Sequence, residues 1–174
     1  SNIDTVILNI VKKPTITYMI DPLSTTSSIN VDGVVISAFP TTIPYPNNQI
    51  VNISANLDPL YEFSSWGSDN VILMPTANSP TASFSASNND TVILYISKKP
   101  TITYMIDPAT TTSSITVDGV IIGAFPTTIP YPTNQIVNIS ANLDPDYGFI
   151  SWGSDSVILM PAANSPIASF SVSN

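Results

Sequence analysis

Residues 81–96, TASFSASNNDTVILYI, decide the fold of this chain. The first half alternates Ala82, Phe84 and Ala86 with polar residues, which predicts a strand with one buried face. Residues 90–96 are mostly Val, Ile, Leu and Tyr and predict a second strand. Because only a short turn separates the two strands, we expect an antiparallel hairpin that lies within one domain.

An 86-residue repeat extends outward from this hairpin through all 174 residues. Residues 87–172 repeat residues 1–86 with 16 differences, and the last two residues match the first two. A period of this length has the size of a domain, in contrast to the roughly 20–50 residues of solenoid repeats. The sequence therefore predicts two tandem domains.

The hairpin also predicts where each module begins and ends. The strand at 90–96 has its counterpart at 4–11, so the natural first module is 14–97. The second module, 98–174, then lacks its closing strand. Residues 1–13 are predicted to be the closing strand of a preceding module or a strand donated to a neighbour. The first alternative corresponds to a piece of a longer array, and the second to head-to-tail strand exchange between copies.

The rest of each module is also predicted to be β structure. No window has a sustained helical period, and 16 prolines interrupt the chain. The pairs Asp32-Gly33 and Asp118-Gly119 predict type I′ hairpin turns, in which both residues need positive φ. Three prolines in 40–48 exclude a central strand, so we expect an extended edge or a crossover loop there. The fold class is all-β, with two tandem small β-sandwich-like modules of about seven strands each. Further strands of the first module are expected at 14–21, 28–31, 34–39, 49–57, 61–66 and 71–74.

The stretch 135–154, QIVNISANLDPDYGFISWGS, resembles the divergent InlB-type B-repeats of bacterial surface proteins. In that family a V-x-L-x-A strand precedes a P-x-x-G-Y-x-F-x-x-W stretch. The chain departs from the family at the Gly before Tyr, which is Leu60 or Asp146, and in its Pro-rich insert. The resemblance implies small β-rich extracellular modules in tandem, which serve as spacers or adhesive stalks and carry no catalytic residues. The matching residues are Val51, Ile53, Ala55, Pro59, Tyr61, Phe63 and Trp66 in the first copy, and Val137, Ile139, Ala141, Pro145, Tyr147, Phe149 and Trp152 in the second.

Composition excludes several classes of function. The chain has no Cys, His or Arg, so Ser-His-Asp and Cys-His catalysis and thiolate or imidazole zinc sites are impossible within it. The only Glu, Glu62, is Gly148 in the second copy, which argues against paired carboxylates for glycoside hydrolysis. The net charge of −8 is unfavourable for nucleic acid and for anionic membranes. No apolar run reaches the roughly 18 residues of a membrane helix. We therefore expect a protein that is not an enzyme, with no nucleic-acid partner and no membrane insertion.

The aromatic residues permit two interpretations. Tyr61, Phe63 and Trp66 with their copies could stack on sugars, but the period-2 pattern favours a place in the core of a small sandwich. Tyr45 and Tyr131, each in a Pro-Tyr-Pro loop, are expected to be exposed. They are the candidates for a glycan contact, although packing within the loop or contact with the next subunit is the interpretation that the sequence favours.

Acidic turns are the candidates for a metal site. Oxygen-rich turns can bind Ca²⁺, but no EF-hand loop pattern is present, and Asp is a common turn residue in any case. No other cofactor is expected. The calcium candidates are Asp58, Asp69, Asp144, Asp146 and Asp155.

Residues Lys98, Lys99 and Pro100 are predicted to form the joint between the modules. A pair of lysines discourages unwanted strand pairing at an edge, and a proline stiffens a linker.

These observations favour a mechanical function. We expect a structural repeat module of an extracellular filament, stalk or adhesin-like array on a cell or virion surface. Its partners would be neighbouring copies of itself, arranged head to tail. The alternative is a module that binds carbohydrate or another surface through its loop tyrosines.

Overall fold

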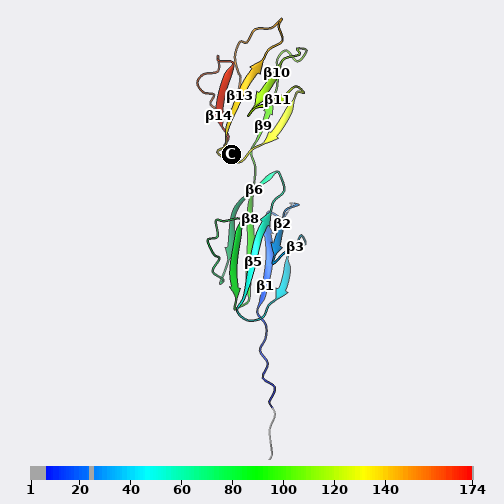
Figure 1. Cartoon of the computed structure of the whole chain (residues 1–174), viewed down its shortest axis with the longest axis vertical. Helices are drawn as coiled ribbons and strands as arrows, with labels where there is room; N and C mark the ends of the chain where they lie inside the picture. Colours follow the sequence, from blue (N-terminus) through cyan, green and yellow to red (C-terminus); the bar gives the residue numbers. More distant parts are fainter. Residues whose placement is uncertain (1–6, 24–25, 174) are drawn as a thin grey trace, which may run out of the picture. The chain divides into compact units, whose positions relative to one another are not determined.

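The computed structural model describes residues 7–23 and 26–173, and these residues form an all-β structure (Figure 1). The chain divides into two compact units, Ser1–Ser97 (unit 1) and Lys98–Asn174 (unit 2). The strands lie in several sheets, which confirms the predicted all-β, sandwich-like fold class. In the described part of the chain, no helix is long and apolar enough to cross a membrane.

The first sheet of unit 1 has the strand order β4-β1-β8-β6. The Pro-rich strand β4 lies at its edge, as the prolines predict. β1 pairs with β4 antiparallel and with β8 parallel, so that Ile16 lies opposite Asp90 and Asp21 opposite Tyr95. The strands are β1 (Thr15–Asp21), β4 (Thr41–Pro44), β6 (Tyr61–Ser68) and β8 (Asp90–Lys98).

The second sheet of unit 1 has the order β3-β2-β5-β7, and all its neighbours are antiparallel. Asp32 and Gly33, which connect β2 to β3, have φ of 48° and 89°, the positive values that a type I′ turn requires. The strands are β2 (Ser28–Val31), β3 (Val34–Ile36), β5 (Gln49–Asn56) and β7 (Thr81–Ala86).

The expected hairpin of 81–86 with 90–96 is wrong. β7 pairs with β5, whereas β8 lies in the other sheet beside β1, 74 residues away in sequence. The turn between them therefore crosses from one sheet to the other. The crossing directs the apolar faces of both strands into one core, where a hairpin would keep both strands in one sheet.

The core of unit 1 lies between its two sheets. The alternation within each strand turns one face inward, so both sheets contribute side chains to a single buried cluster. Its largest fully buried members are Tyr18, Phe84, Ile16, Ile20, Ile29, Leu94, Val51 and Val92.

Unit 2 repeats this plan only in part. Its four-stranded sheet, β11-β10-β13-β14, corresponds to β3-β2-β5-β7, and Asp118 and Gly119 again have positive φ. Its other sheet has only two strands, β12 and β9. The strands are β9 (Thr101–Tyr104), β10 (Ser114–Val117), β11 (Val120–Ile122), β12 (Thr127–Pro130), β13 (Ile136–Asn142) and β14 (Ile167–Ser171).

Two predicted strands have a different outcome. Residues 71–74 do not form a strand, and only Met74 makes an isolated bridge, to Ser83. For the predicted strand at 4–11, residues 1–6 lie outside the described residues, and residues 7–14 contain no strand. The place that this sequence would take in unit 1 is already filled by β8, which carries nearly the same residues.

Candidate functional site

The open side of β9 is the main structural difference between the units. In unit 1, β8 lies between β1 and β6 and pairs with both. In unit 2, β12 is the only strand among residues 7–23 and 26–173 that pairs with β9, and residues 147–154, the counterpart of β6, contain no strand. Without a strand at this place, both flanking segments have unpaired backbone groups, and such groups are a template for strand addition.

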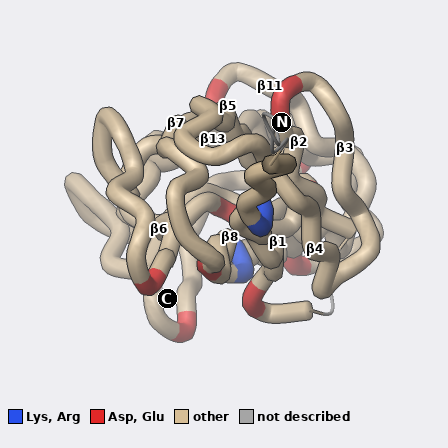
Figure 2. The backbone as a smooth tube through the Cα atoms, turned by 90° about the horizontal axis from the view of Figure 1, so that it is seen from below, with Lys and Arg blue, Asp and Glu red and all other residues tan. Residues whose placement is uncertain are grey.

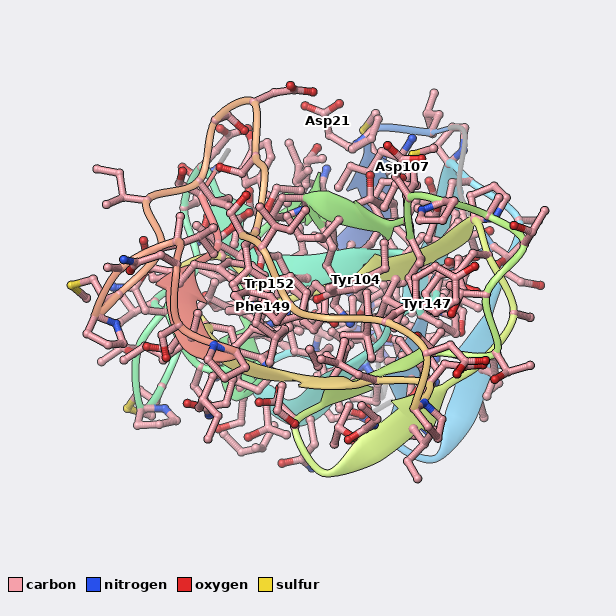
Figure 3. All side chains as sticks on the ribbon, turned by 90° about the horizontal axis from the view of Figure 1, so that it is seen from above. Asp21, Tyr104, Asp107, Tyr147, Phe149 and Trp152 are labelled. Atoms are coloured by element: carbon pink, nitrogen blue, oxygen red, sulfur yellow. The ribbon has the colours of Figure 1, made fainter. Side chains whose placement is uncertain are left out.

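A groove of about 370 Å³ occupies this place in unit 2. Met105, Ile106 and Asp107 line one side, and residues 147–153 line the other. Figure 3 labels Asp107 from the first side and Tyr147, Phe149 and Trp152 from the second. The lining is mainly apolar and aromatic, as in sites that bind an apolar partner.

Side chains around the groove are more exposed than their counterparts under β8. Trp66 is only 3% exposed, whereas Trp152 is half-buried. In unit 1, a Cβ atom added at Gly67 would come within 2.6 Å of the Tyr95 ring, whereas the space beside the counterpart Gly153 is open. The groove residues 105–107 correspond to 19–21 in unit 1, so the groove lies where residues 93–95 of β8 cover unit 1.

The Asp90 carboxylate fixes the start of β8 in unit 1. It accepts hydrogen bonds from the backbone N–H groups of Asp69 (3.1 Å), Asn70 (3.0 Å), Val71 (2.6 Å) and Thr91 (2.7 Å). Burial disfavours the charged form, but these four donors outweigh burial and hold the pKa of Asp90 below its ordinary value. In unit 2, no carboxylate of the described residues takes this place beside residues 155–157.

The six predicted core aromatics differ in burial between the two units. In unit 1, Trp66 is buried and donates its indole N–H to the Ser79 carbonyl (3.0 Å), while Tyr61 and Phe63 are half-buried. In unit 2, the ring centroids of Phe149 and Trp152 lie 5.6 Å apart, and both residues are half-buried.

The prediction of a core position is wrong for Tyr147, which is 41% exposed. Its counterpart Tyr61 belongs to β6, which pairs with β8, and unit 2 has no strand there.

The predicted exposure of Tyr45 and Tyr131 is wrong, because each is only 6% exposed. Tyr45 directly follows the edge strand β4, and its backbone N–H donates to the Pro14 carbonyl (2.9 Å), which turns the ring inward. Its hydroxyl meets that of Tyr18, and Tyr131 meets Tyr104 in the same way. These tyrosines have no exposed face for a glycan.

Two of the candidate calcium ligands, Asp58 and Asp144, accept hydrogen bonds from neighbouring loop residues. The Asp58 carboxylate accepts hydrogen bonds from the Thr26 hydroxyl and from the Leu60 N–H (2.8 Å), and these bonds lower its pKa. Asp144 does the same with Thr112 and the Asp146 N–H (3.0 Å), and its pKa is also lowered. Among the described residues, no three carboxylates gather as a metal site would require, and this holds for Asp69 and Asp155 as well.

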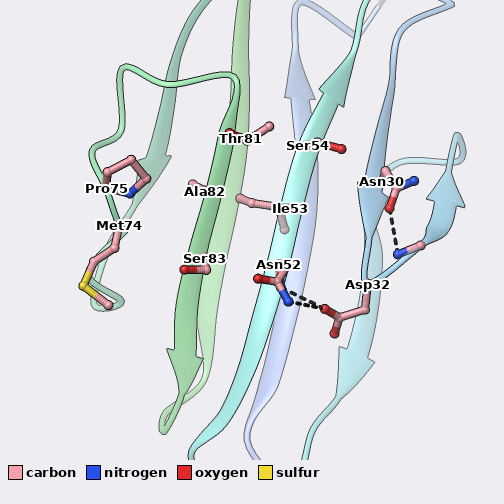
Figure 4. Close-up of a pocket in the computed structure, with 11 residues that line it drawn as sticks. Asn30, Asp32, Asn52, Ile53, Ser54, Met74, Pro75, Thr81, Ala82 and Ser83 are labelled. Carbon is pink, nitrogen blue, oxygen red and sulfur yellow. Dashed lines mark hydrogen bonds between the residues drawn. The ribbon is translucent and has the colours of Figure 1, made fainter.

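A second depression, of about 380 Å³, lies on the β3-β2-β5-β7 sheet (Figure 4). Its polar groups bind one another. The Asp32 carboxylate accepts from the Asn52 backbone N–H (2.9 Å) and side chain (3.1 Å), and Asn30 accepts from the Gly33 N–H (2.8 Å). These bonds hold the turn and engage the Asp32 carboxylate.

Charged residues are sparse and scattered along the backbone (Figure 2). Of the predicted joint, Lys98 is the last residue of β8, and Lys99 and Pro100 connect it to β9. Lys98 is exposed, and Lys99 and Pro100 are half-buried.

Comparisons of this chain with protein-family models, with curated proteins and with solved structures find no match. The resemblance to B-repeats therefore rests on the quoted residues alone.

Sequence reasoning did not identify the role of Asp90 or of the buried Tyr18 and Tyr104. Asp90 is indistinguishable from a turn aspartate until its partners, about 20 residues upstream, are known. For the tyrosines, the alternation of Ile16, Tyr18 and Ile20 in β1 was a usable signal of an inward face.

Proposed function

We propose that this chain is a structural repeat segment of an extracellular filament, stalk or adhesin-like surface array, whose units act as passive building blocks. The observation that supports this most strongly is the repetition of internal contacts. The Tyr18–Tyr45 hydroxyl contact recurs as Tyr104–Tyr131, both at 2.8 Å. The bond of Trp66 to Ser79 likewise recurs in unit 2, from Trp152 to Ser165 (2.9 Å).

Internal contacts that are the same in both copies suit an array, because every unit of an array has the same role and needs the same internal structure. An active site, in contrast, needs to occur only once. The low content of charged residues, 9%, and the surface of Thr, Ser and Asn fit an exposed structural role. The resemblance of 51–66 and 135–154 to the B-repeats of bacterial surface proteins supports an extracellular place.

Electron microscopy of the purified chain over a concentration series tests this function. We expect end-to-end particles that lengthen with concentration, and labelling of intact cells or virions by an antibody against the chain. Isolated particles at every concentration, together with labelling only after lysis, would contradict the proposal.

A further inference from the structure

The groove of unit 2 matches one specific kind of ligand, a β-strand with the sequence of β8. In unit 1 the same position, between β1 and β6, holds β8 itself. The units differ at only 16 of 86 aligned positions, so the walls of the two sites are made of nearly the same residues. A strand that fits the site in unit 1 should therefore also fit the site in unit 2.

A second copy of the β8 sequence is present in the chain, at residues 4–12. It reads DTVILNIVK, where β8 reads DTVILYISK. The two differences, Asn9 for Tyr95 and Val11 for Ser97, fall at positions where β8 does not face the core. The three apolar core-facing residues of β8, Val92, Leu94 and Ile96, are retained as Val6, Leu8 and Ile10.

These retained apolar residues are uncovered where the structure describes them. Leu8 is 84% exposed and Ile10 85% exposed, whereas Leu94 is fully buried and Ile96 nearly so. Exposed apolar side chains in a sequence that forms a strand elsewhere indicate an interaction segment. The chain thus has both an unfilled groove and an uncovered strand that matches it.

The position of the segment in the chain favours a partner molecule. Only Lys13 and Pro14 separate it from β1 of unit 1. The segment enters unit 1 at the start of β1, whereas the chain continues to unit 2 from the end of β8. Because β1 and β8 are parallel neighbours, these two points lie at opposite ends of the strand pair. A groove on a second copy is free of this separation.

We propose that the groove of unit 2 binds residues 4–12 of a second copy of this chain, as a strand parallel to β9. This inference rests on the proposed function and names the partner surface that joins the units. The register follows that of β8 on β1: Asp4 lies opposite Ile102, and Asn9 opposite Asp107. Residues 147–154 then pair with the other side of the strand, as β6 pairs with β8.

Asp4 provides the anchor in this arrangement. It corresponds to Asp90, so its carboxylate accepts from the backbone N–H groups of residues 155–157, as Asp90 does from residues 69–71. Charge-assisted hydrogen bonds of this kind fix register as well as adding affinity. The acceptor therefore prefers a strand that begins with an acidic residue.

A complementation experiment with the full chain tests the proposal. Leu8→Asp/Ile10→Asp removes the donor function, and Ile106→Asp, on the wall of the groove, removes the acceptor function. By sedimentation velocity we expect the wild type to form oligomers that grow with concentration, and each variant alone to be monomeric. A mixture of the two variants should form a one-to-one dimer and nothing larger, since only one donor and one acceptor remain.

The matched control is Ile72→Asp, which makes the same change at an apolar side chain that is 80% exposed and lies outside both the segment 4–12 and the groove. It should oligomerise like the wild type. A synthetic peptide of residues 4–12 should shorten the wild-type oligomers. In the monomeric donor variant, whose groove is empty, the peptide should shield Trp152 from acrylamide quenching. The same peptide with Asp4→Asn should bind about tenfold more weakly or worse.

The proposal would be overturned by oligomers that persist in the donor variant, or by a mixture of the two variants that stays monomeric. A monomeric wild type in which Leu8→Asp/Ile10→Asp uncovers Trp152 would also overturn it, in favour of a strand from the same chain. The test is separable from that of the array. A one-to-one dimer without extended particles in micrographs would support the binding site and contradict the filament. Filaments formed by the donor variant would support the filament and contradict the binding site.

Discussion

The hydroxyl oxygens of Tyr18 and Tyr45 lie 2.8 Å apart in the core of unit 1, although Tyr18 lies in β1 and Tyr45, 27 positions later, directly follows β4. Each hydroxyl is the partner of the other, so the pair satisfies two polar groups that burial removes from water. The identical contact in unit 2 makes this pair a structural element of the repeat.

Tyr45→Phe should lower the free energy of unfolding of unit 1 by about 1–3 kcal/mol, because the Tyr18 hydroxyl stays buried without its partner. Urea unfolding followed by Trp66 fluorescence in a Trp152→Phe background measures this change. Tyr18→Phe/Tyr45→Phe removes both polar groups and should cost less than the sum of the single changes. Additive costs would show that the hydroxyl contact contributes nothing specific.

Stability should fall as the pH rises above about 10, the ordinary pKa of tyrosine. Burial first of all, and the second tyrosine of each pair, raise the pKa of Tyr18 and Tyr104, and burial also raises that of Tyr45 and Tyr131. The folded state then holds protons that the unfolded state releases, so this contribution is complete below the ordinary pKa and is lost above it. Unfolding curves from pH 8 to 11 measure the slope, and Tyr18→Phe/Tyr45→Phe should flatten it for unit 1.

Asp90→Asn should destabilise unit 1 by about 1–3 kcal/mol at pH 7, since the amide replaces a carboxylate that accepts four backbone N–H groups. The folded pKa of Asp90 is lowered, so its contribution is present above the ordinary carboxyl pKa and disappears as the pH falls through the folded value. The difference between variant and wild type should therefore shrink in acid. Asp21→Asn, at an exposed carboxyl of the same sheet, is the control, and an equal loss there would refute the anchor.

Gly119→Ala should destabilise unit 2 by about 1–2 kcal/mol, because its φ of 84° lies in the region that L-residues avoid. Gly123→Ser is the control in the same unit. Its surroundings are open, and serine is the residue that unit 1 has at this position, Ser37. Thermal unfolding of the two variants in the Trp66→Phe background reports the difference through Trp152.

Local patterns predicted most of the strands but not all of their partners. The alternation in 81–86 gives the correct inner face, since a period of two is a property of each strand alone. The pairing of β8 with β1 depends on residues 74 positions apart and on which sheet can bury the apolar face, which no short window contains. The hairpin prediction was therefore right about the two strands and wrong about the sheet that the second strand joins.

The burial of the loop tyrosines was missed for a related reason. Prolines around Tyr45 correctly excluded a central strand, but they did not show that the edge strand β4 ends by directing the next side chain inward. In unit 2, the exposure of Tyr147 depends on a strand that the unit does not contain, so the same motif has different surroundings in the two copies.

The parallel pairing of β1 with β8 determines how unit 1 responds to being stretched. The polypeptide enters at the start of β1 and leaves at the end of β8, and these strands are direct neighbours running in the same direction. Tension on the two ends therefore shears the two strands along each other. In this geometry, the hydrogen bonds between β1 and β8 are loaded together and must break together, instead of breaking one after another from one end. An array of such units would resist shear from flow or attachment even if each unit had only modest thermodynamic stability.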